Sequence, residues 1–432
     1  MISVIKRQSP ARLIALGFIS LILIGSILLR LPFCVKEGVH LSYIDSLYTS
    51  TSAVCVTGLI AVDAGDTFTP LGQMILGLLM QTGGLGVTTV GAGLMLLMRK
   101  KVDLKERTLV KEALNVDSGK GLITLVKRIF IVTIVFETVG ALLSLLVFIK
   151  DYPFSKALGI SIFHSVAAFN NAGFDILGNF QSLVNYSDSI MLNIVTCFLI
   201  FFGGIGFLVI WELLEKKCRW KKLSMHAKIV LSVSGVLIVV GTMLIKATEN
   251  VSWMGAVFNS ISARTAGFST YSLAGFSKSG LLVIMILMFI GSSPGSTGGG
   301  IKTTTFFVLL QGIRSSATNT SEKAFHYSIP KDAYKKASVI ALIAASVIIL
   351  GTYLMGIFEP DADFFDVFFE VTSAYGTVGL STGITPGLSV PSKLLSIIIM
   401  YIGRLGPWTV ATLWHFSKGE RVSFPEGNIS IG

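Results

Sequence analysis

A short motif that ends in glycine occurs four times along the chain, and its residue types suit the coordination of a cation by backbone oxygens. In the clearest copy, Arg264-Thr265-Ala266-Gly267-Phe268, a large apolar residue follows the glycine. A small residue stands five positions before each glycine, namely Ala53, Ala168, Ser262 and Ala374. The three residues that end at each glycine are Val56-Thr57-Gly58, Asn171-Ala172-Gly173, Thr265-Ala266-Gly267 and Thr377-Val378-Gly379.

Glycine suits the end of this motif because it reaches left-handed backbone angles without a Cβ clash. The residue before each glycine is uncharged, so a cation there would be bound by backbone carbonyls. A short helix that ends inside a membrane leaves its last carbonyls unpaired and carries partial negative charge at that end. Four such ends around one axis would replace the hydration shell of a large monovalent cation, whereas Ca²⁺ prefers carboxylates. A single copy is more simply explained as a glycine helix cap, but four copies in one membrane chain argue against that interpretation.

A second feature is a glycine-rich interruption between two apolar segments, Leu281 to Ile290 and Ile301 to Leu310. A helix does not continue through so many glycines and a proline. We therefore predict a flexible barrier beneath the glycine motifs, formed by Gly291, Pro294, Gly295, Gly298, Gly299 and Gly300. Lys302 follows it and is predicted to pair with a carboxylate or phosphate. A nucleotide-binding phosphate loop is the weaker interpretation, because Ile301 interrupts the pattern and no strand precedes it.

Three further segments carry closely spaced glycines: Gly83-Gly84-Leu85-Gly86, Gly203-Gly204-Ile205-Gly206 and Gly403-Arg404-Leu405-Gly406. Small residues of this kind allow close helix packing, which is the simpler interpretation of the first two. In the last segment Arg404 stands amid apolar sequence, where an arginine is expensive and usually functional. We predict that Arg404 faces the ion path. The alternative is a structural ion pair with Glu137 or Asp66.

The composition places these motifs in a membrane protein. The chain has 432 residues, of which 52% are hydrophobic and only 14% charged, and its mean hydropathy is +0.75. Soluble domains average about 25% charged residues, and a spanning helix needs about 20 apolar residues. Neither the four cysteines nor the five histidines have metal-ligand spacing. We see no nucleophile or metal constellation, and we predict no catalytic residues and no enzyme activity.

The net charge of +11 does not indicate a nucleic-acid partner, because of where the charge lies. Lys and Arg cluster in alternate connecting segments, such as Arg99 to Arg128 and Lys216 to Lys228, and acidic residues dominate the others. This is the positive-inside pattern. It predicts cytoplasmic N- and C-termini, with the glycine motifs near the outer face.

The chain divides into four similar units: residues 1–98, 122–215, 223–314 and 332–416, with a cytoplasmic loop at 99–121 and a cytoplasmic tail at 417–432. Each unit has a spanning helix, a half-depth helix, the motif and a second apolar segment. The predicted half-depth helices are residues 41–54, 156–168, 252–263 and 363–375. Second helices are predicted at 70–98, 189–214 and 391–416, and the second segment of the third unit, 279–314, is the one interrupted at 291–300. We predict an all-α membrane protein with eight spanning and four half-depth helices.

These residues resemble the Trk/Ktr/HKT superfamily of potassium transporters, especially the bacterial KtrB-like membrane subunits. Four stretches carry most of the resemblance: Val56-Thr57-Gly58-Leu59, Phe169-Asn170-Asn171-Ala172-Gly173-Phe174, Arg264-Thr265-Ala266-Gly267-Phe268 and Ala374-Tyr375-Gly376-Thr377-Val378-Gly379-Leu380. The resemblance implies four M1-P-M2 repeats with re-entrant pore helices, in pseudo-fourfold arrangement around one pore. It makes Gly58, Gly173, Gly267 and Gly379 the glycines of a K⁺ filter. The break at 291–300 becomes the gating loop, with Arg404 beside it.

The resemblance also implies a setting for the chain. Family members are multi-pass proteins of the bacterial plasma membrane and form homodimers. They sit on a cytosolic, octameric RCK (KtrA-like) ring that binds ATP or ADP, so nucleotide is expected on the partner and no covalent cofactor on this chain. Uptake in the family is often stimulated by Na⁺. The Na⁺-selective plant branch has serine at the first filter glycine, so Gly58 implies K⁺ as the substrate. The rival interpretation, an alternating-access carrier, fits inverted two-fold repeats rather than four repeats of one orientation.

Overall fold

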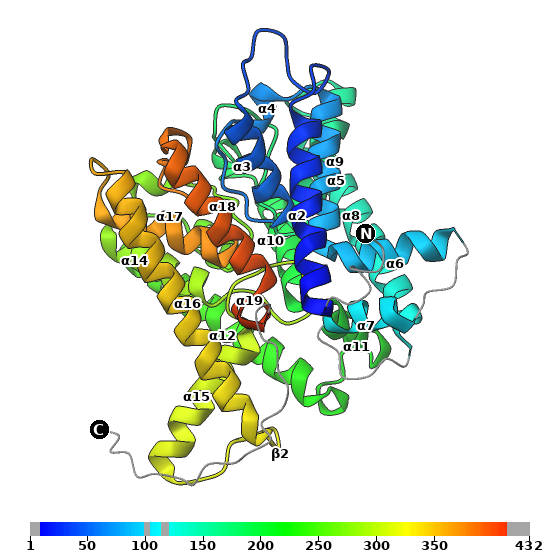
Figure 1. Cartoon of the computed structure of the whole chain (residues 1–432), viewed down its shortest axis with the longest axis vertical. Coiled ribbons are helices and arrows are strands. Elements are labelled where there is room, and N and C mark those ends of the chain that lie inside the picture. The colour runs from blue at the N-terminus through cyan, green and yellow to red at the C-terminus, as the bar shows by residue number, and fades with distance from the viewer. Residues whose placement is uncertain (1–8, 99–103, 114–120, 413–432) are drawn as a thin grey trace.

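The computed structural model describes residues 9–98, 104–113 and 121–412 of the chain, and these residues are mostly helical (Figure 1). The tail predicted at 417–432 lies outside them. Most of the loop predicted at 99–121 also lies outside, apart from α7 (Leu104–Ala113), which packs against α2 (Pro10–Leu29). Many helices begin at a side chain that caps their free N–H groups. The capping residues are Ser9, Ser42, Asp63, Thr69, Ser224, Ser252, Ser277 and Asp363.

Four helices are long and apolar enough to cross a membrane, by length and composition. They are α2, α8 (Leu122–Phe148), α12 (Met225–Thr248) and α16 (Lys331–Phe358). Each opens one of the four predicted units. Their outward faces expose large apolar side chains, including Leu16, Ile134, Val239 and Leu350. A soluble protein rarely exposes so much apolar surface. These faces are suited to contact with the lipid of a bilayer.

Four short helices follow the long ones, as the sequence predicted: α3 (Tyr43–Val54), α9 (Phe154–Phe169), α13 (Trp253–Ser262) and α17 (Phe364–Gly376). At 10 to 16 residues they are too short to span a bilayer. Each packs against the long helix before it. Their C-terminal halves are mostly buried, and several of the largest fully buried side chains, including Tyr48, Phe169 and Tyr375, lie on them. The core of the protein therefore surrounds the glycine motifs.

The second segments are not the continuous helices that the sequence predicted. α5 (Pro70–Leu85) and α6 (Val87–Leu97) meet at 99°, and α10 (Ile190–Ile205) and α11 (Phe207–Glu215) meet at 100°. In the fourth unit, α18 (Val390–Leu405) breaks before α19 (Pro407–Thr412). The breaks fall at glycines with positive φ, namely Gly86 (86°), Gly206 (94°) and Gly406 (84°). The prediction was wrong because a left-handed residue cannot continue a right-handed helix.

In the third unit the predicted interruption is confirmed. α14 (Lys278–Phe289) ends before it and α15 (Thr303–Thr318) begins after it. Within the described residues, four unbroken helices and two bent pairs qualify as candidate spans, at most six in all. The eight that we predicted are therefore not established by length and composition alone.

The remaining elements are small. They are α4 (Ala64–Thr67), the 3₁₀ turns Val184–Tyr186, Trp220–Lys222, Leu273–Gly275 and Thr385–Gly387, and the strands β1 (Lys323–Ala324) and β2 (Tyr327–Ser328). The two strands form an antiparallel hairpin that pairs Lys323 with Ser328. Figure 1 shows this hairpin and the end of α15 at the lower end of the molecule, far from α4 at the upper end. The basic residues near the hairpin thus lie at the end opposite to α4.

Candidate ion pathway

The structure brings the four motif glycines together in a ring. A Cβ atom placed on any of them would lie closer than 3.0 Å to the carbonyl oxygen that precedes the next glycine. These contacts join Gly58 to Ala172, Gly173 to Ala266, Gly267 to Val378 and Gly379 to Thr57. Each unit contacts the next one in the chain, and the fourth unit contacts the first, so the four contacts form a closed ring. All four glycines have positive φ, between 67° and 93°. Both the backbone angle and the close approach therefore require glycine here.

The half-depth helices of the first, second and fourth units end in the same way. In each, an N–H bonds to the carbonyl five residues earlier: Thr57 to Ser52 at 2.7 Å, Ala172 to Ala167 at 2.8 Å and Val378 to Ser373 at 3.0 Å. This Schellman ending needs a left-handed residue, usually glycine. Here the left-handed residues are Val56 (φ 50°), Asn171 (56°) and Thr377 (49°). Such angles are strained for β-branched residues, and the surrounding contacts must impose them.

The third unit ends its half-depth helix differently. Its Ala266 N–H bonds to Ser262 only four residues earlier, at 2.8 Å. Ser262 therefore occupies the place of Ser52, Ala167 and Ser373. The four motifs were matched in the sequence by a small residue five positions before each glycine. In the third unit this match is wrong by one residue, because its helix end is one residue shorter. The Ser262 hydroxyl donates to the carbonyl of Phe268, which ties the residue after the glycine to the helix end.

The carbonyl oxygens nearest the glycines are available as ligands. Within residues 9–98 and 121–412, no hydrogen bond to the carbonyls of Thr57, Ala172, Ala266 or Val378 is present. Four free carbonyls at the ends of four buried helices form a site of partial negative charge. The filter residues predicted from sequence are therefore brought together, and the chemistry they offer is coordination by backbone oxygen.

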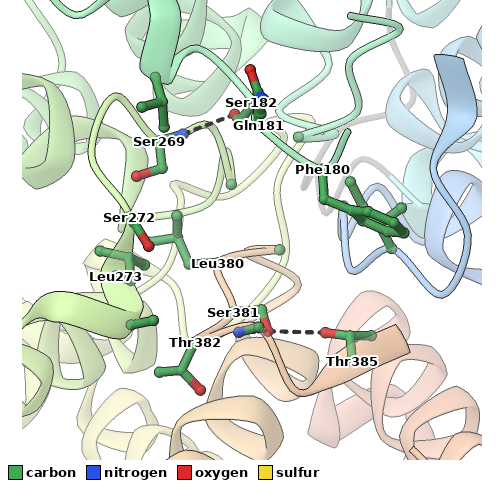
Figure 2. Close-up of a pocket in the computed structure, with 18 of the residues that line it drawn as sticks. Phe180, Gln181, Ser182, Ser269, Ser272, Leu273, Leu380, Ser381, Thr382 and Thr385 are labelled. Carbon is green, nitrogen blue, oxygen red and sulfur yellow. Dashed lines mark hydrogen bonds between the residues drawn. The ribbon is translucent and has the colours of Figure 1, made fainter. Parts of the chain in front are cut away.

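A cavity of about 600 Å³ opens on one side of the ring, and all four glycines line it. Figure 2 shows its walls, which carry Ser182, Ser269, Ser272, Ser381 and Thr382. These hydroxyls and the glycine backbone make the cavity wettable, so a hydrated cation can approach the ring from this side.

Asp175 is the acidic side chain in the lining of this cavity. Its pKa is raised to about 7, mainly by burial and to a smaller extent by the nearby carboxylates of Asp63 and Asp66, while the hydrogen bond from the Leu177 N–H acts in the opposite direction. Asp63 and Asp66 accept the N–H groups of Phe180 and Asn179 at 2.7 and 2.8 Å. They hold the segment that rims the cavity. Sequence reasoning missed Asp175, although its position two residues after Gly173 was a signal.

The glycine-rich break lies directly against the ring. The N–H of Gly299 donates to the Thr377 hydroxyl at 3.0 Å, and a Cβ on Gly298 would lie 2.8 Å from the Thr265 side chain. The N–H groups of Ser293 and Thr297 donate to the carbonyls of Gly204 and Gly203 at 3.0 and 3.2 Å. The break is thus hydrogen-bonded to the second and fourth units. The break therefore contacts residues that precede the glycines, whereas the cavity is lined by residues that follow them.

The other predicted residues of the break serve its own folding. Gly291 lies against Gly299, and Ile290 and Ile301 form a parallel bridge, so the segment folds back on itself. The carbonyl of Gly295 accepts the N–H of Phe207 at 3.0 Å, and Gly206 packs against the carbonyl of Pro294. Gly300 has a φ of 69°, which only glycine adopts easily.

Within the described residues Lys302 does not pair with a carboxylate, so that part of the prediction was wrong, and pairing with a phosphate stays a prediction. Its amino group donates to the carbonyl of Gly298 at 2.6 Å and lies 3.3 Å from the Ser292 hydroxyl. Backbone carbonyls of the break satisfy this cation locally. Lys302 therefore stabilises the folded conformation of the break through contacts within the break itself.

Arg404 links the break to another helix. It donates to the carbonyl of Thr297 in the break, and to the carbonyls of Gly83 and Gly84 in the last turn of α5. A cation is favourable at a helix C-terminus. Glu137 instead accepts the Asn170 amide at 3.0 Å, and Asp66 accepts the N–H of Asn179. The alternative of a structural ion pair between Arg404 and either carboxylate is wrong.

The closely spaced glycines pack as the simpler interpretation predicted. A Cβ on Gly83 would collide with the carbonyl of Val54, one on Gly203 with that of Phe169, and one on Gly403 with that of Tyr375. These three carbonyls all stand four residues before a motif glycine. The second segments therefore touch the ends of the half-depth helices and hold them in place.

The chain matches known transport proteins over nearly its whole length. The family model TrkH, a cation transport protein, covers residues 11–228 and 223–417. Ktr system potassium uptake protein B of Bacillus subtilis (strain 168) is 36% identical over 99% of this chain and 97% of its own length. The potassium/sodium uptake protein NtpJ of Enterococcus hirae is 36% identical over 99% and 98%.

A solved structure agrees with these matches. The potassium transporter TrkH from Vibrio parahaemolyticus superposes with a TM-score of 0.75 at 19% identity, over 95% of this chain and 86% of that one. At this identity the likeness establishes the fold. Together the matches define the class as membrane proteins that transport cations, and not enzymes. The chain belongs to the TrkH family of cation transport proteins.

Proposed function

We propose that this chain is the ion-conducting membrane subunit of a potassium uptake system, in which K⁺ passes through the ring of backbone carbonyls. The observation that carries the proposal is the closed sequence of contacts from Gly58 through Gly173 and Gly267 to Gly379 and back. Relatives named for potassium uptake, at 36% identity over the full length, support K⁺ as the substrate. The four units then act as M1-P-M2 repeats around one pore.

Growth and K⁺ uptake test this function in a bacterium that lacks its own potassium uptake systems. The native chain should restore growth at low K⁺. Gly58→Ser should lower K⁺/Na⁺ discrimination by about tenfold or more, equivalent to about 1.4 kcal/mol, because its Cβ would meet the carbonyl of Ala172. Gly38→Ser is the matched control, since Gly38 also has positive φ (81°) but has open space around it. Equal discrimination in Gly58→Ser and the control would refute the filter assignment.

The proposal includes a gate. The break at 291–300, with Lys302 and Arg404, closes the inner side of the ring, and its movement admits the ion. Its hydrogen bonds to Gly203, Gly204 and Thr377 support this role. Shortening the glycine-rich segment should raise basal flux, and normal gating after such a deletion would count against it.

The proposal also includes the assembly. A homodimer in the bacterial plasma membrane would bind a cytosolic RCK ring that carries the nucleotide. Relatives named as part of a Ktr system support a partner subunit, and the name of the Enterococcus hirae relative supports a role for Na⁺. If the chain alone fails to restore growth, co-expression with an RCK subunit decides whether a missing partner or a different substrate is the reason.

A further inference from the structure

Glu370 is a buried carboxyl that the ion pathway described above does not use. It lies on α17, nine residues before Gly379, and is 0% exposed. One carboxyl oxygen accepts the Thr385 hydroxyl at 2.5 Å, and the other has no hydrogen-bond partner among the residues that the structure describes. The ion pairs formed within the described residues do not include it. Burying a carboxyl without a cation is expensive, so its position calls for an explanation.

The contacts of Glu370 lead to the wall of the cavity. The Thr385 hydroxyl also lies 3.0 Å from the hydroxyl of Ser381, which accepts the N–H of Gly383 at 2.9 Å. Figure 2 shows Ser381 and Thr385 facing each other, and both residues line the cavity. Ser381 stands two residues after Gly379. A chain of hydrogen bonds therefore joins the half-depth helix to the segment that follows the glycine.

The equivalent residues of the other units make no such link. They are Thr49 and His164, nine residues before their glycines, and Asn259, eight before because of the shorter helix end. Thr49 and Asn259 bond to their own helices, at the carbonyls of Asp45 (2.8 Å) and Gly255 (2.9 Å). His164 bonds to Thr196 of α10 at 2.9 Å. Among these four positions, only Glu370 holds the segment after its own glycine.

We propose that Glu370 is a positioning residue for ion selection: through Thr385 it fixes Ser381 and so sets the outer mouth of the ring at Gly379. The inference rests on the proposed function, in which K⁺ crosses this ring. A fixed set of carbonyls favours an ion of one size, and a set free to relax tolerates others. Loss of the hydrogen bond should therefore weaken K⁺ binding and admit Na⁺, rather than merely lower the amount of folded protein.

The test uses the full chain, purified and reconstituted at equal amounts into liposomes. K⁺ uptake is measured over a range of K⁺ concentrations with and without competing Na⁺. Glu370→Leu and Thr385→Val each remove the bond from one side, and the double variant removes both partners. Glu370→Gln keeps an acceptor oxygen of the same shape. Thr49→Val is the matched control, because its hydroxyl bonds only within its own helix.

We expect Glu370→Leu and Thr385→Val each to raise the KM for K⁺ or the relative uptake of Na⁺ by about tenfold, the range of one buried hydrogen bond. The double variant should be no worse than either single one, because both remove the same interaction. Glu370→Gln should restore the native KM to within about twofold.

Three results would overturn the proposal. The first is a native KM and selectivity in Thr385→Val, which is decisive even if Glu370→Leu fails to fold. The second is a Glu370→Gln variant as impaired as Glu370→Leu, which would show that charge matters and not the hydrogen bond. The third is equal passage of K⁺ and Na⁺ by the native chain, unchanged in the variants, which would refute the proposed function as well. The first two leave the proposed function standing.

Discussion

At the scale of single residues, the ion pathway is built from backbone conformations that few residues adopt. The four ring glycines have positive φ and leave no room for a Cβ. Val56 and Thr377 share the left-handed region, at a cost of order 1–3 kcal/mol each. The repetition of the glycines is visible in the sequence, and the structure brings the four together. The sequence did not predict the strained Val56 and Thr377, since nothing in a β-branched residue type indicates a left-handed angle.

Also at the residue scale, Asp175 leads us to predict that the KM for K⁺ depends on external pH. With its pKa raised to about 7, the carboxyl is neutral below that pH and negative above it. A negative charge in the cavity concentrates cations near the ring. The KM for K⁺ should therefore rise about twofold to threefold as external pH falls from about 8 to about 6, because one charge several ångströms away in water contributes about 0.5 kcal/mol.

Uptake by liposomes at fixed internal pH measures this effect. Asp175→Asn should show a high KM at both pH values. Asp361→Asn is the control, because Asp361 is exposed and is not part of the cavity lining. The same carboxyl should make the folded protein less stable as pH rises through the window between its ordinary value of 3.8 and about 7, because the folded state binds the proton more tightly. A pH-dependent KM that persists in Asp175→Asn would contradict the assignment.

At the scale of elements, the half-depth helices were predictable and the bends were not. The half-depth helices stand out as apolar stretches too short to span, each followed by the motif. The bends at Gly86, Gly206 and Gly406 lie inside continuous apolar sequence, where hydropathy favours one long helix. Their signal was the closely spaced glycines, which were correctly predicted to pack closely. Each of these segments does two things: Gly83, Gly203 and Gly403 touch the half-depth helices, and the glycine three residues later ends the helix through its positive φ.

At the same scale, the break at 291–300 yields a prediction about its proposed role as a barrier. Thr377 accepts the N–H of Gly299, so Thr377→Val leaves a buried N–H without a partner. This costs about 1–3 kcal/mol, and it should shift the barrier toward its open arrangement by roughly fivefold or more. Efflux of K⁺ from loaded liposomes should increase by that factor in the absence of any partner protein.

Two further variants define the cause of such a leak. Thr377→Ser keeps the hydroxyl and should not leak. Thr372 lies on α17, the helix that Thr377 directly follows, and its hydroxyl donates to the carbonyl of Phe368. Thr372→Val therefore controls for the loss of a nearby threonine hydroxyl. If Thr377→Val and Thr377→Ser leak equally, the hydrogen bond to Gly299 does not hold the barrier closed.

At the scale of the whole molecule, the ring closes because the fourth unit packs against the first. Lys393 of α18 forms an ion pair with Asp45 of α3 at 2.8 Å, and the pair is largely buried. The Tyr401 hydroxyl donates to the carbonyl of Ala15 at 2.8 Å. The fourth unit thus packs on the first as the other units pack on their neighbours. Sequence patterns predict four units, but not these contacts, because long-range partners leave no local signature.

The orientation in the membrane is the last whole-molecule prediction, and it uses a cysteine that the chain already has. Cys218 is exposed and follows α11 in a basic segment, whereas Cys34 and Cys55 are buried. The positive-inside rule places this segment in the cytoplasm. A membrane-impermeant thiol reagent should therefore label the native chain in inside-out vesicles and leave it unlabelled in intact cells.

An outward-facing marker completes this experiment. Asn185 is exposed and lines the cavity. The predicted orientation places this cavity outside the cell, so Asn185→Cys in a Cys218→Ser background should give the reverse pattern. Labelling of Cys218 in intact cells would show that the orientation in the membrane is the reverse of the predicted one. The cavity would then face the cytoplasm, and the break at 291–300 would face the exterior. The proposal that K⁺ enters through the cavity that Asp175 lines would then be wrong. Labelling of both sites from one side would instead contradict the membrane position of the ring between them.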